Sequence, residues 1–328
     1  MVGLKEVYSG IFCNQISLPK NPLKYLNCYI IPSKERNLII DTGFNRPECE
    51  KDFLNGIQKL NIDMAKTDIL LTHLHSDHIG LASLAEKMGA KIFTGAKEES
   101  AVRVIGTKKY WDFFYRLMQM YGLSKYGLRV EDHPGYQYRP SEMIHSLILK
   151  EGDVLEVSGY SFKVVDIPGH TSGQIGLYEM NHKLFFCGDH ILGNITPNII
   201  AWGTDNSDLE RYMENLKKIY DYEIDLMLPG HRELITDHKA RIRELLFHHE
   251  QRLAEIIEIL SESGEKSPCE VAAKMTWDLK IENWESFPKA QKWFSAGEAM
   301  AHLEYLYDLG KIERREKESV MYYRGKSN

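Results

Sequence analysis

The chain has 328 residues, 43% of them hydrophobic, and a formal net charge of −6. Its length exceeds that of one average domain, and its composition is typical of a globular protein with a buried core. Proteins that bind polyanions without selectivity are usually basic, so the net charge argues against that class of function.

The cysteines and the apolar runs predict a soluble cytoplasmic protein without a membrane segment. Five cysteines are scattered along the chain and form no C-x-x-C pair, which is typical of a reducing compartment. The first residues include Lys5 and Glu6 and lack the apolar stretch of a signal peptide. No run approaches the roughly 18 apolar residues that a membrane span needs.

Short apolar runs separated by Gly, Pro, Asn and Asp characterise residues 1–235. Such runs, rich in β-branched and aromatic residues, predict buried strands. Asn181 and His182 separate two of them, which predicts a hairpin. The predicted strands include 37–40, 68–71, 162–165, 176–180 and 183–187.

Helices are predicted between some of these strands. Residues 79–88 are apolar at helical spacing and precede Gly89, a residue type that often ends helices. Ser207 and Glu210 have the spacing of a capping box and predict a helix that continues to about Tyr220. Strands and helices in this order predict an α/β sandwich, with the sheets inside and the helices outside.

The segment 96–147 is predicted to be helical and is rich in large side chains, above all between Tyr110 and Tyr121. Two interpretations stay open. The helix is either amphipathic and packed on the core, or a lid beside the functional site that offers Trp111 and Tyr115 to a substrate. An aromatic wall of the second kind favours an apolar substrate part.

A second domain is predicted to follow a first domain that spans residues 1–237. Residues 238–328 contain helices near 251–261, 267–274 and 295–309 and then a short hairpin. From Arg241 onward there are 14 Lys and Arg residues against 16 Asp and Glu residues. Because nucleic-acid binding needs positive charge, a packing or homodimerisation module is favoured over a nucleic-acid partner.

Histidine and aspartate are concentrated in Thr72-His-Leu-His-Ser-Asp-His78, which follows a predicted strand and precedes a predicted helix. Residues two apart in an extended chain point the same way. His73, His75 and Asp77 are therefore expected on one side, with His78 turned away at the start of the helix. This arrangement of imidazoles and a carboxylate can bind two cations a few ångströms apart.

Three later loops contribute the same residue types. His170, Asp189 and His231 each come shortly after an apolar strand, so all of them are expected at one end of the sandwich. The combined set predicts a metal site formed by His73, His75, Asp77, His78, His170, Asp189 and His231.

These motifs resemble the metallo-β-lactamase superfamily, whose hallmark is H-x-H-x-D-H followed by later His, Asp and His. The resemblance runs from about Tyr8 to His231 and includes Asp41-Thr-Gly43. It implies an αββα sandwich with a dinuclear centre. The first metal would be bound by His73, His75 and His170. The second metal would be bound by Asp77, His78 and His231. Asp189 would bind both metals.

The resemblance also implies the chemistry of the site. The expected cofactors are two divalent ions, Zn²⁺ in the first place, with Fe and Mn as alternatives that use the same ligands. A hydroxide that bridges the two metals would be the nucleophile, and Asp77 would orient it and pass a proton to the leaving group.

Single residues separate this chain from some branches of the superfamily. Position 75 is His, where oxygen-reducing flavo-diiron relatives carry Glu, so a redox function is disfavoured. Asp189 stands where zinc β-lactamases of the main type carry Cys, so β-lactam cleavage as the main role is disfavoured. His190 follows the bridging residue and either contacts substrate, supports Asp189 or packs in the core.

The end of the chain resembles the winged-helix extension of glyoxalase-II-like and ribonuclease-like relatives. The expected function is hydrolysis of a small ester, thioester or lactone by a metal-dependent enzyme. The alternative is a phosphodiesterase or ribonuclease that uses the same dinuclear site.

Overall fold

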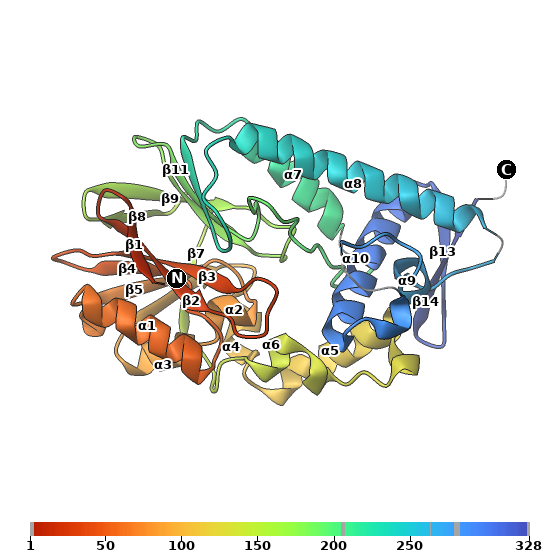
Figure 1. The fold of residues 1–328 in the computed structure, drawn as a ribbon, viewed down its shortest axis with the longest axis horizontal. Coiled ribbons are helices and arrows are strands. Elements are labelled where there is room, and N and C mark those ends of the chain that lie inside the picture. Colours follow the sequence, from red (N-terminus) through yellow and green to blue (C-terminus); the bar gives the residue numbers. More distant parts are fainter. Residues whose placement is uncertain (1–2, 205–206, 263, 279–282, 327–328) are drawn as a thin grey trace.

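Two β-sheets lie face to face in the first two thirds of the chain (Figure 1). The computed structural model describes residues 3–204, 207–262, 264–278 and 283–326. The larger sheet contains β1 (Leu4–Tyr8), β2 (Ile11–Ser17), β3 (Tyr25–Ile31), β4 (Asn37–Ile40), β5 (Thr67–Leu71), β6 (Lys91–Gly95) and β7 (Ser146–Leu149), in that order. The smaller sheet has the order β12-β11-β10-β9-β8 and contains β8 (Val154–Val157), β9 (Tyr160–Asp166), β10 (Ile175–Glu179), β11 (Leu184–Gly188) and β12 (Leu226–Pro229).

Both faces of the central strands are buried, which explains why the strands are apolar without interruption. In β4, Leu38 and Ile40 belong to the core between the sheets, whereas Ile39 belongs to the core under the outer helices. The rings of Tyr29 and Phe186 meet across the sandwich with their centroids 5.0 Å apart. The predicted strands 37–40 and 68–71 and the hairpin at 181–182 are present, the last as the antiparallel pair β10 and β11.

Helices cover the outer faces of the sandwich. In Figure 1, α1 and α3 lie on one side of the two sheets and α7 lies on the other. The helices of this part are α1 (Pro47–Lys59), α2 (Ser76–Ile79), α3 (Ala82–Lys87), α4 (Glu99–Val104), α5 (Lys108–Met120), α6 (Pro134–Gln137) and α7 (Asp208–Tyr220). This layering is the predicted αββα sandwich.

The prediction of one continuous helix over residues 79–88 is wrong. The chain forms α2, turns at Gly80 and Leu81, and then forms α3. The backbone N–H of Leu81 donates to the carbonyl of Gly43 instead of continuing the helical ladder. A side chain at Gly80 would collide with the backbone of Asn45 at 2.4 Å, so the break lets the loop after β4 approach the first turn of α2.

The predicted capping box at Ser207 is also wrong, although the helix it begins is present as α7. The hydroxyl of Ser207 makes no cap bond and donates to the carboxylate of Asp308 at 2.7 Å. The helical prediction over 96–147 is correct for α4, α5 and α6, but its last two residues already belong to β7.

The C-terminal region is helical and ends in the predicted hairpin. Its elements are α8 (His238–Ser261), α9 (Pro268–Ala272), α10 (Lys289–Asp308), β13 (Ile312–Lys317) and β14 (Val320–Gly325). Two of its helices begin earlier than predicted, at His238 and Lys289. The winged-helix assignment and the domain boundary after residue 237 stay predictions.

Helix α10 lies at the centre of this region, next to α7, α8 and α9. Its buried residues include Ala296, Ala299, Met300 and Leu303. The helix is therefore covered on nearly all sides and connects the C-terminal region to the sandwich. Among the described residues, no helix is both long and apolar enough to cross a membrane.

Candidate metal centre

The predicted ligands lie where strands of both sheets end. His73 and His75 are in the loop after β5, and Asp77 and His78 are in the first turn of α2. The other three follow strands of the smaller sheet and are His170 after β9, Asp189 after β11 and His231 after β12.

Two glycines allow these loops to approach one another. Gly169 has a φ of 140°, and a Cβ there would lie 2.4 Å from the Cα of Tyr212. A Cβ on Gly230 would lie 2.5 Å from Oδ1 of Asp189 and 2.8 Å from Cε1 of His78. The backbone at Gly230 therefore forms one wall of the space between the ligands, and a side chain would fill it.

The structure brings all seven predicted ligands together in three overlapping groups. Within each group the ligand atoms lie within 4.8 Å of one another. The groups are His73, His75 and His170; Asp77, His78 and His231; and His73, His78 and Asp189. The first two are the two triads that the resemblance implies.

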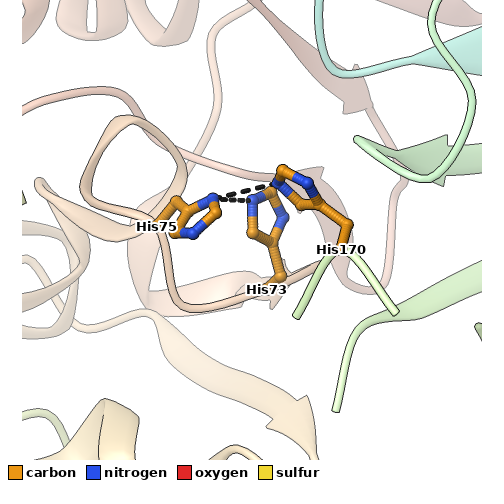
Figure 2. A group of neighbouring side chains, drawn as sticks. All are labelled: His73, His75 and His170. Atoms are coloured by element: carbon orange, nitrogen blue, oxygen red, sulfur yellow. Dashed lines mark hydrogen bonds between the residues drawn. The ribbon is translucent and has the colours of Figure 1, made fainter. Parts of the chain in front are cut away.

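The histidine triad has its nitrogens close together (Figure 2). Nδ1 of His75 lies 3.0 Å from Nε2 of His73 and 3.0 Å from Nε2 of His170. Burial lowers the pKa of His75 to about 3 and that of His73 well below its ordinary value. The rings are therefore neutral at physiological pH, as metal ligands must be.

Outer hydrogen bonds fix which nitrogen of each ring carries the proton. Nδ1 of His170 donates to the carbonyl of Asn198 at 2.9 Å, and Nδ1 of His231 donates to the carbonyl of Tyr25 at 2.8 Å. Because a carbonyl oxygen only accepts, each Nδ1 carries a hydrogen, and each Nε2 is the nitrogen that faces the site and can bind a metal ion once it carries no proton.

Asp189 lies between the two triads. Its Oδ1 is 3.5 Å from Nε2 of His78, and its Oδ2 is 3.8 Å from His170 and 3.4 Å from His231. Burial opposes the charge of Asp189, but the facing His231 and His78 outweigh it and lower the pKa of this carboxyl well below its usual range. Asp189 therefore supplies a charged oxygen to either triad.

Three polar atoms that face the centre lack hydrogen-bond partners among the described residues. Nε2 of His78, Nε2 of His231 and Oδ1 of Asp189 are buried and make no hydrogen bond. Buried polar groups are almost always paired, and a group of unpaired imidazole and carboxylate atoms is the donor set that a divalent transition metal prefers. The residues present therefore fit two such ions.

The remaining predicted residues belong to none of the three groups. Trp111 is buried in the core, where its indole N–H donates to the carbonyl of Ile105 at 2.8 Å. Tyr115 is 52% exposed on α5, and the ring of His190 packs edge-on against Tyr212. Substrate contact by these three residues stays a prediction.

An aromatic residue that no sequence motif indicates, Trp202, lies against the ligands. The ring of Trp202 stacks on His75 at 27° with the centroids 6.3 Å apart. Glu98 is likewise part of no sequence motif. Its Oε1 accepts the backbone N–H of Gly173 at 3.2 Å and supports the loop after His170. The sequence indicates a place near the ligands for Trp202 only in that this residue follows Asp189 before the next helix.

Asp41 supports the second triad from outside. Its Oδ2 accepts from Nδ1 of His78 at 2.7 Å and from the hydroxyl of Thr72 at 2.8 Å, and its Oδ1 accepts the N–H of Thr72 at 2.8 Å. The carboxylate thereby fixes the ring of His78 and the start of the ligand loop together.

Asp41→Asn is expected to weaken the binding of a divalent ion such as Zn²⁺ to the triad that contains His78 by about 10–100-fold, because an amide cannot accept all three of these bonds. Competition with a chromophoric chelator measures the change. Asp68→Asn is the matched control, because that carboxylate pairs with Arg36 near the surface. Equal Zn²⁺ affinities of the two variants would show that Asp41 has no special role.

Comparisons with known proteins agree with this geometry. The family model described as the metallo-beta-lactamase superfamily matches residues 23–231. A protein named beta-lactamase-like protein 2 homolog from Caenorhabditis elegans is 25% identical over 79% of this chain and 75% of its own length.

Two further relatives carry names that state an activity. Hydroxyacylglutathione hydrolase GloC from Haemophilus influenzae is 30% identical over 50% of this chain and 65% of its own. Atrochrysone carboxyl ACP thioesterase from Aspergillus fumigatus is 24% identical over 72% of this chain and 59% of its own.

The fold has a close counterpart among solved structures. A metallo-beta-lactamase family protein from Thermus thermophilus superposes with a TM-score of 0.83 at 24% identity, covering 98% of this chain and 100% of the other. The family match spans the segment that carries all seven ligands. The chain therefore belongs to the metallo-beta-lactamase superfamily of metal-dependent hydrolases.

Proposed function

We propose that this hydrolase binds two divalent metal ions, Zn²⁺ in the first place, and cleaves a small thioester, ester or lactone. The convergence of seven ligands, three of which have a buried polar atom that makes no hydrogen bond to the described residues, carries the metal part of the proposal. When bound, two such ions polarise a carbonyl oxygen and lower the pKa of a water molecule.

Asp77 is the residue suited to proton transfer. Burial opposes its charge, but His231, whose Nε2 lies 3.3 Å from Oδ2 of Asp77, and the nearby His78 lower its pKa to about 2. The carboxylate is therefore ionised at neutral pH and can accept a proton from the attacking water. It then returns that proton to the leaving group.

The surroundings of the histidine triad favour an acyl substrate over a polyanion. Trp202 lies against His75, and the ring of Phe114 meets Trp202 with the centroids 5.7 Å apart. Aromatic surfaces of this kind desolvate an acyl chain. The net charge of −6 repels RNA instead of attracting it.

The names of two relatives favour the same substrate class. One is called a hydrolase of a hydroxyacylglutathione and the other an ACP thioesterase. Both matches cover less than two thirds of the relative's own length, so the substrates of those whole proteins serve only as guides. The shared acyl chemistry ranks a thioester first among the three acyl classes.

A substrate panel tests the proposal. Aryl esters, acyl thioesters and lactones should be turned over faster than bis-aryl phosphodiesters or RNA at equal concentration. A chelator should abolish the activity and Zn²⁺ should restore it, with His73→Ala as the blank. Efficient cleavage of phosphodiester or RNA, with every acyl substrate at blank level, would establish the phosphodiesterase or ribonuclease alternative.

Trp202→Ala tests the role of the aromatic wall. We expect KM for a long acyl chain to rise about tenfold and KM for an acetyl substrate to stay nearly unchanged, because contact with about two methylene groups is lost. Trp111→Ala is the matched control and should lower stability without a preference for chain length. If Trp111→Ala were the chain-length-selective variant, the interpretation of the 96–147 segment as a lid would be the correct one.

A further inference from the structure

The loop between β11 and α7 rests directly on α10. Nδ2 of Asn198 donates to Oε2 of Glu298 at 2.7 Å, and the N–H of Ala201 donates to the carbonyl of Gly297 at 3.2 Å. A Cβ on Gly297 would lie 2.9 Å from Cγ2 of Ile200, so the loop and the helix are in close contact.

The same loop reaches the histidine triad. The carbonyl of Asn198 accepts the Nδ1–H of His170 at 2.9 Å, and Nε2 of His170 in turn lies 3.0 Å from Nδ1 of His75. Asn198 therefore uses its backbone to orient a ligand and its side chain to contact α10. One residue connects the C-terminal region to the metal centre.

Glu298 is well placed to fix Asn198. The residue is only 7% exposed, and a buried carboxylate is costly unless other groups compensate it. Its Oε1 lies 3.9 Å from Nε of Arg252 on α8, and its backbone carbonyl accepts Nδ1–H of His302 at 2.8 Å. One oxygen of the carboxylate thus faces the cation of Arg252 on α8, and the other is directed at Asn198.

We propose that Glu298 is a positioning residue that orients His170 through Asn198, so that the C-terminal helical region is a working part of the metal centre. The proposal rests on the proposed function, because it requires that the triad of His73, His75 and His170 binds a metal ion. It assigns a role to a region that contributes no ligand to the three groups.

Metal affinity is the measurement that separates positioning from packing. Glu298→Ala and Asn198→Ala are expected to weaken Zn²⁺ binding at one of the two sites by about 10–100-fold, the usual effect of losing an outer partner. The double variant should be no weaker than the worse single variant, because both act through one path. Glu298→Gln keeps an acceptor oxygen and should restore most of the affinity.

The absorption spectrum of the Co²⁺-loaded protein reports the ligand geometry directly. It should change in Glu298→Ala and return toward that of the wild type in Glu298→Gln. Asn198→Ala decides the outcome if Glu298→Ala does not fold.

Glu304→Ala is the matched control on the same helix. Glu304 is 2% exposed and accepts from Arg314 and from the hydroxyl of Tyr323, not from Asn198. The Glu304→Ala variant should have a lower Tm but an unchanged Zn²⁺ affinity and an unchanged Co²⁺ spectrum. Wild-type affinity in Glu298→Ala, or an equal loss in Glu304→Ala, would overturn the proposal. A wild-type chain that binds no metal would instead refute the proposed function itself.

Discussion

Asp189→Ala is expected to release about one metal ion per chain and to lower kcat/KM by more than about 100-fold. The expected loss exceeds the 10–100-fold typical of an outer partner because a ligand itself is removed. The two oxygens of Asp189 face both triads. Oδ1 faces His78 of the second triad, and Oδ2 faces His170 of the first triad and His231 of the second. Without it, no carboxylate at this position would set the distance between the two ions of the proposed centre.

Elemental analysis of the purified variant, together with turnover of the best acyl substrate, measures this effect. Asp189→Asn keeps the size of the side chain and one neutral oxygen, so it should retain more metal and activity than Asp189→Ala. Circular dichroism should show that both variants are folded. Retention of both ions in Asp189→Ala would mean that this carboxylate is not the bridge.

Much of the metal centre was predictable because each ligand lies close to the end of an apolar strand. β4, β11 and β12 are apolar because both of their faces are buried, and such runs are visible in a sequence. Asp189 comes directly after β11, and His231 comes two residues after β12. The same rule placed His73 two residues after β5.

Local patterns failed where a distant segment competed for a hydrogen bond. The helix predicted over 79–88 is broken because the N–H of Leu81 bonds to Gly43. The capping box at Ser207 is absent because its hydroxyl bonds to Asp308, about a hundred residues away. Neither partner is detectable from the spacing of residues within one element.

The contacts of α10 with the loop that carries Asn198 were unpredictable for the same reason. Asn198 and Glu298 are separated by 100 positions, and neither belongs to a motif. Trp111 shows a second limit of local patterns, because an aromatic residue at helical spacing has the same pattern in a core as in a lid, and both interpretations of this helix were therefore open. The indole N–H bonded to Ile105 shows its place in the core.

The affinity for metal is expected to rise steeply with pH, because protons occupy part of the centre in the metal-free chain. Nε2 of His231 lies 3.3 Å from Oδ2 of Asp77 and 3.4 Å from Oδ2 of Asp189. Burial opposes a proton on His231, but the two carboxylates outweigh burial and raise its pKa to about 9. A metal ion must displace this proton, so binding should strengthen by about tenfold per pH unit below that value.

His78 adds to the effect. Burial again opposes its protonation, and Asp41 and Asp189 again outweigh burial and raise its pKa well above the ordinary value. Between pH 6 and pH 8 the Zn²⁺ affinity should therefore increase by at least about 100-fold. Calorimetry in buffers of different ionisation enthalpy should detect release of one to two protons per chain. An affinity that is flat over this interval would contradict the assignment of these protons.

The stability of the metal-free chain should show the opposite dependence on pH. A pKa raised from 6.5 to about 9 in the folded state means that protonated His231 stabilises the fold fully below pH 6.5. This contribution is lost as pH rises through about 9. Tm of the chelated protein should thus fall between pH 6.5 and 9. Over the same range the difference between Tm of the Zn²⁺-loaded protein and Tm of the chelated protein should increase. Metal binding strengthens as the protons leave, and a ligand that binds the folded state stabilises it.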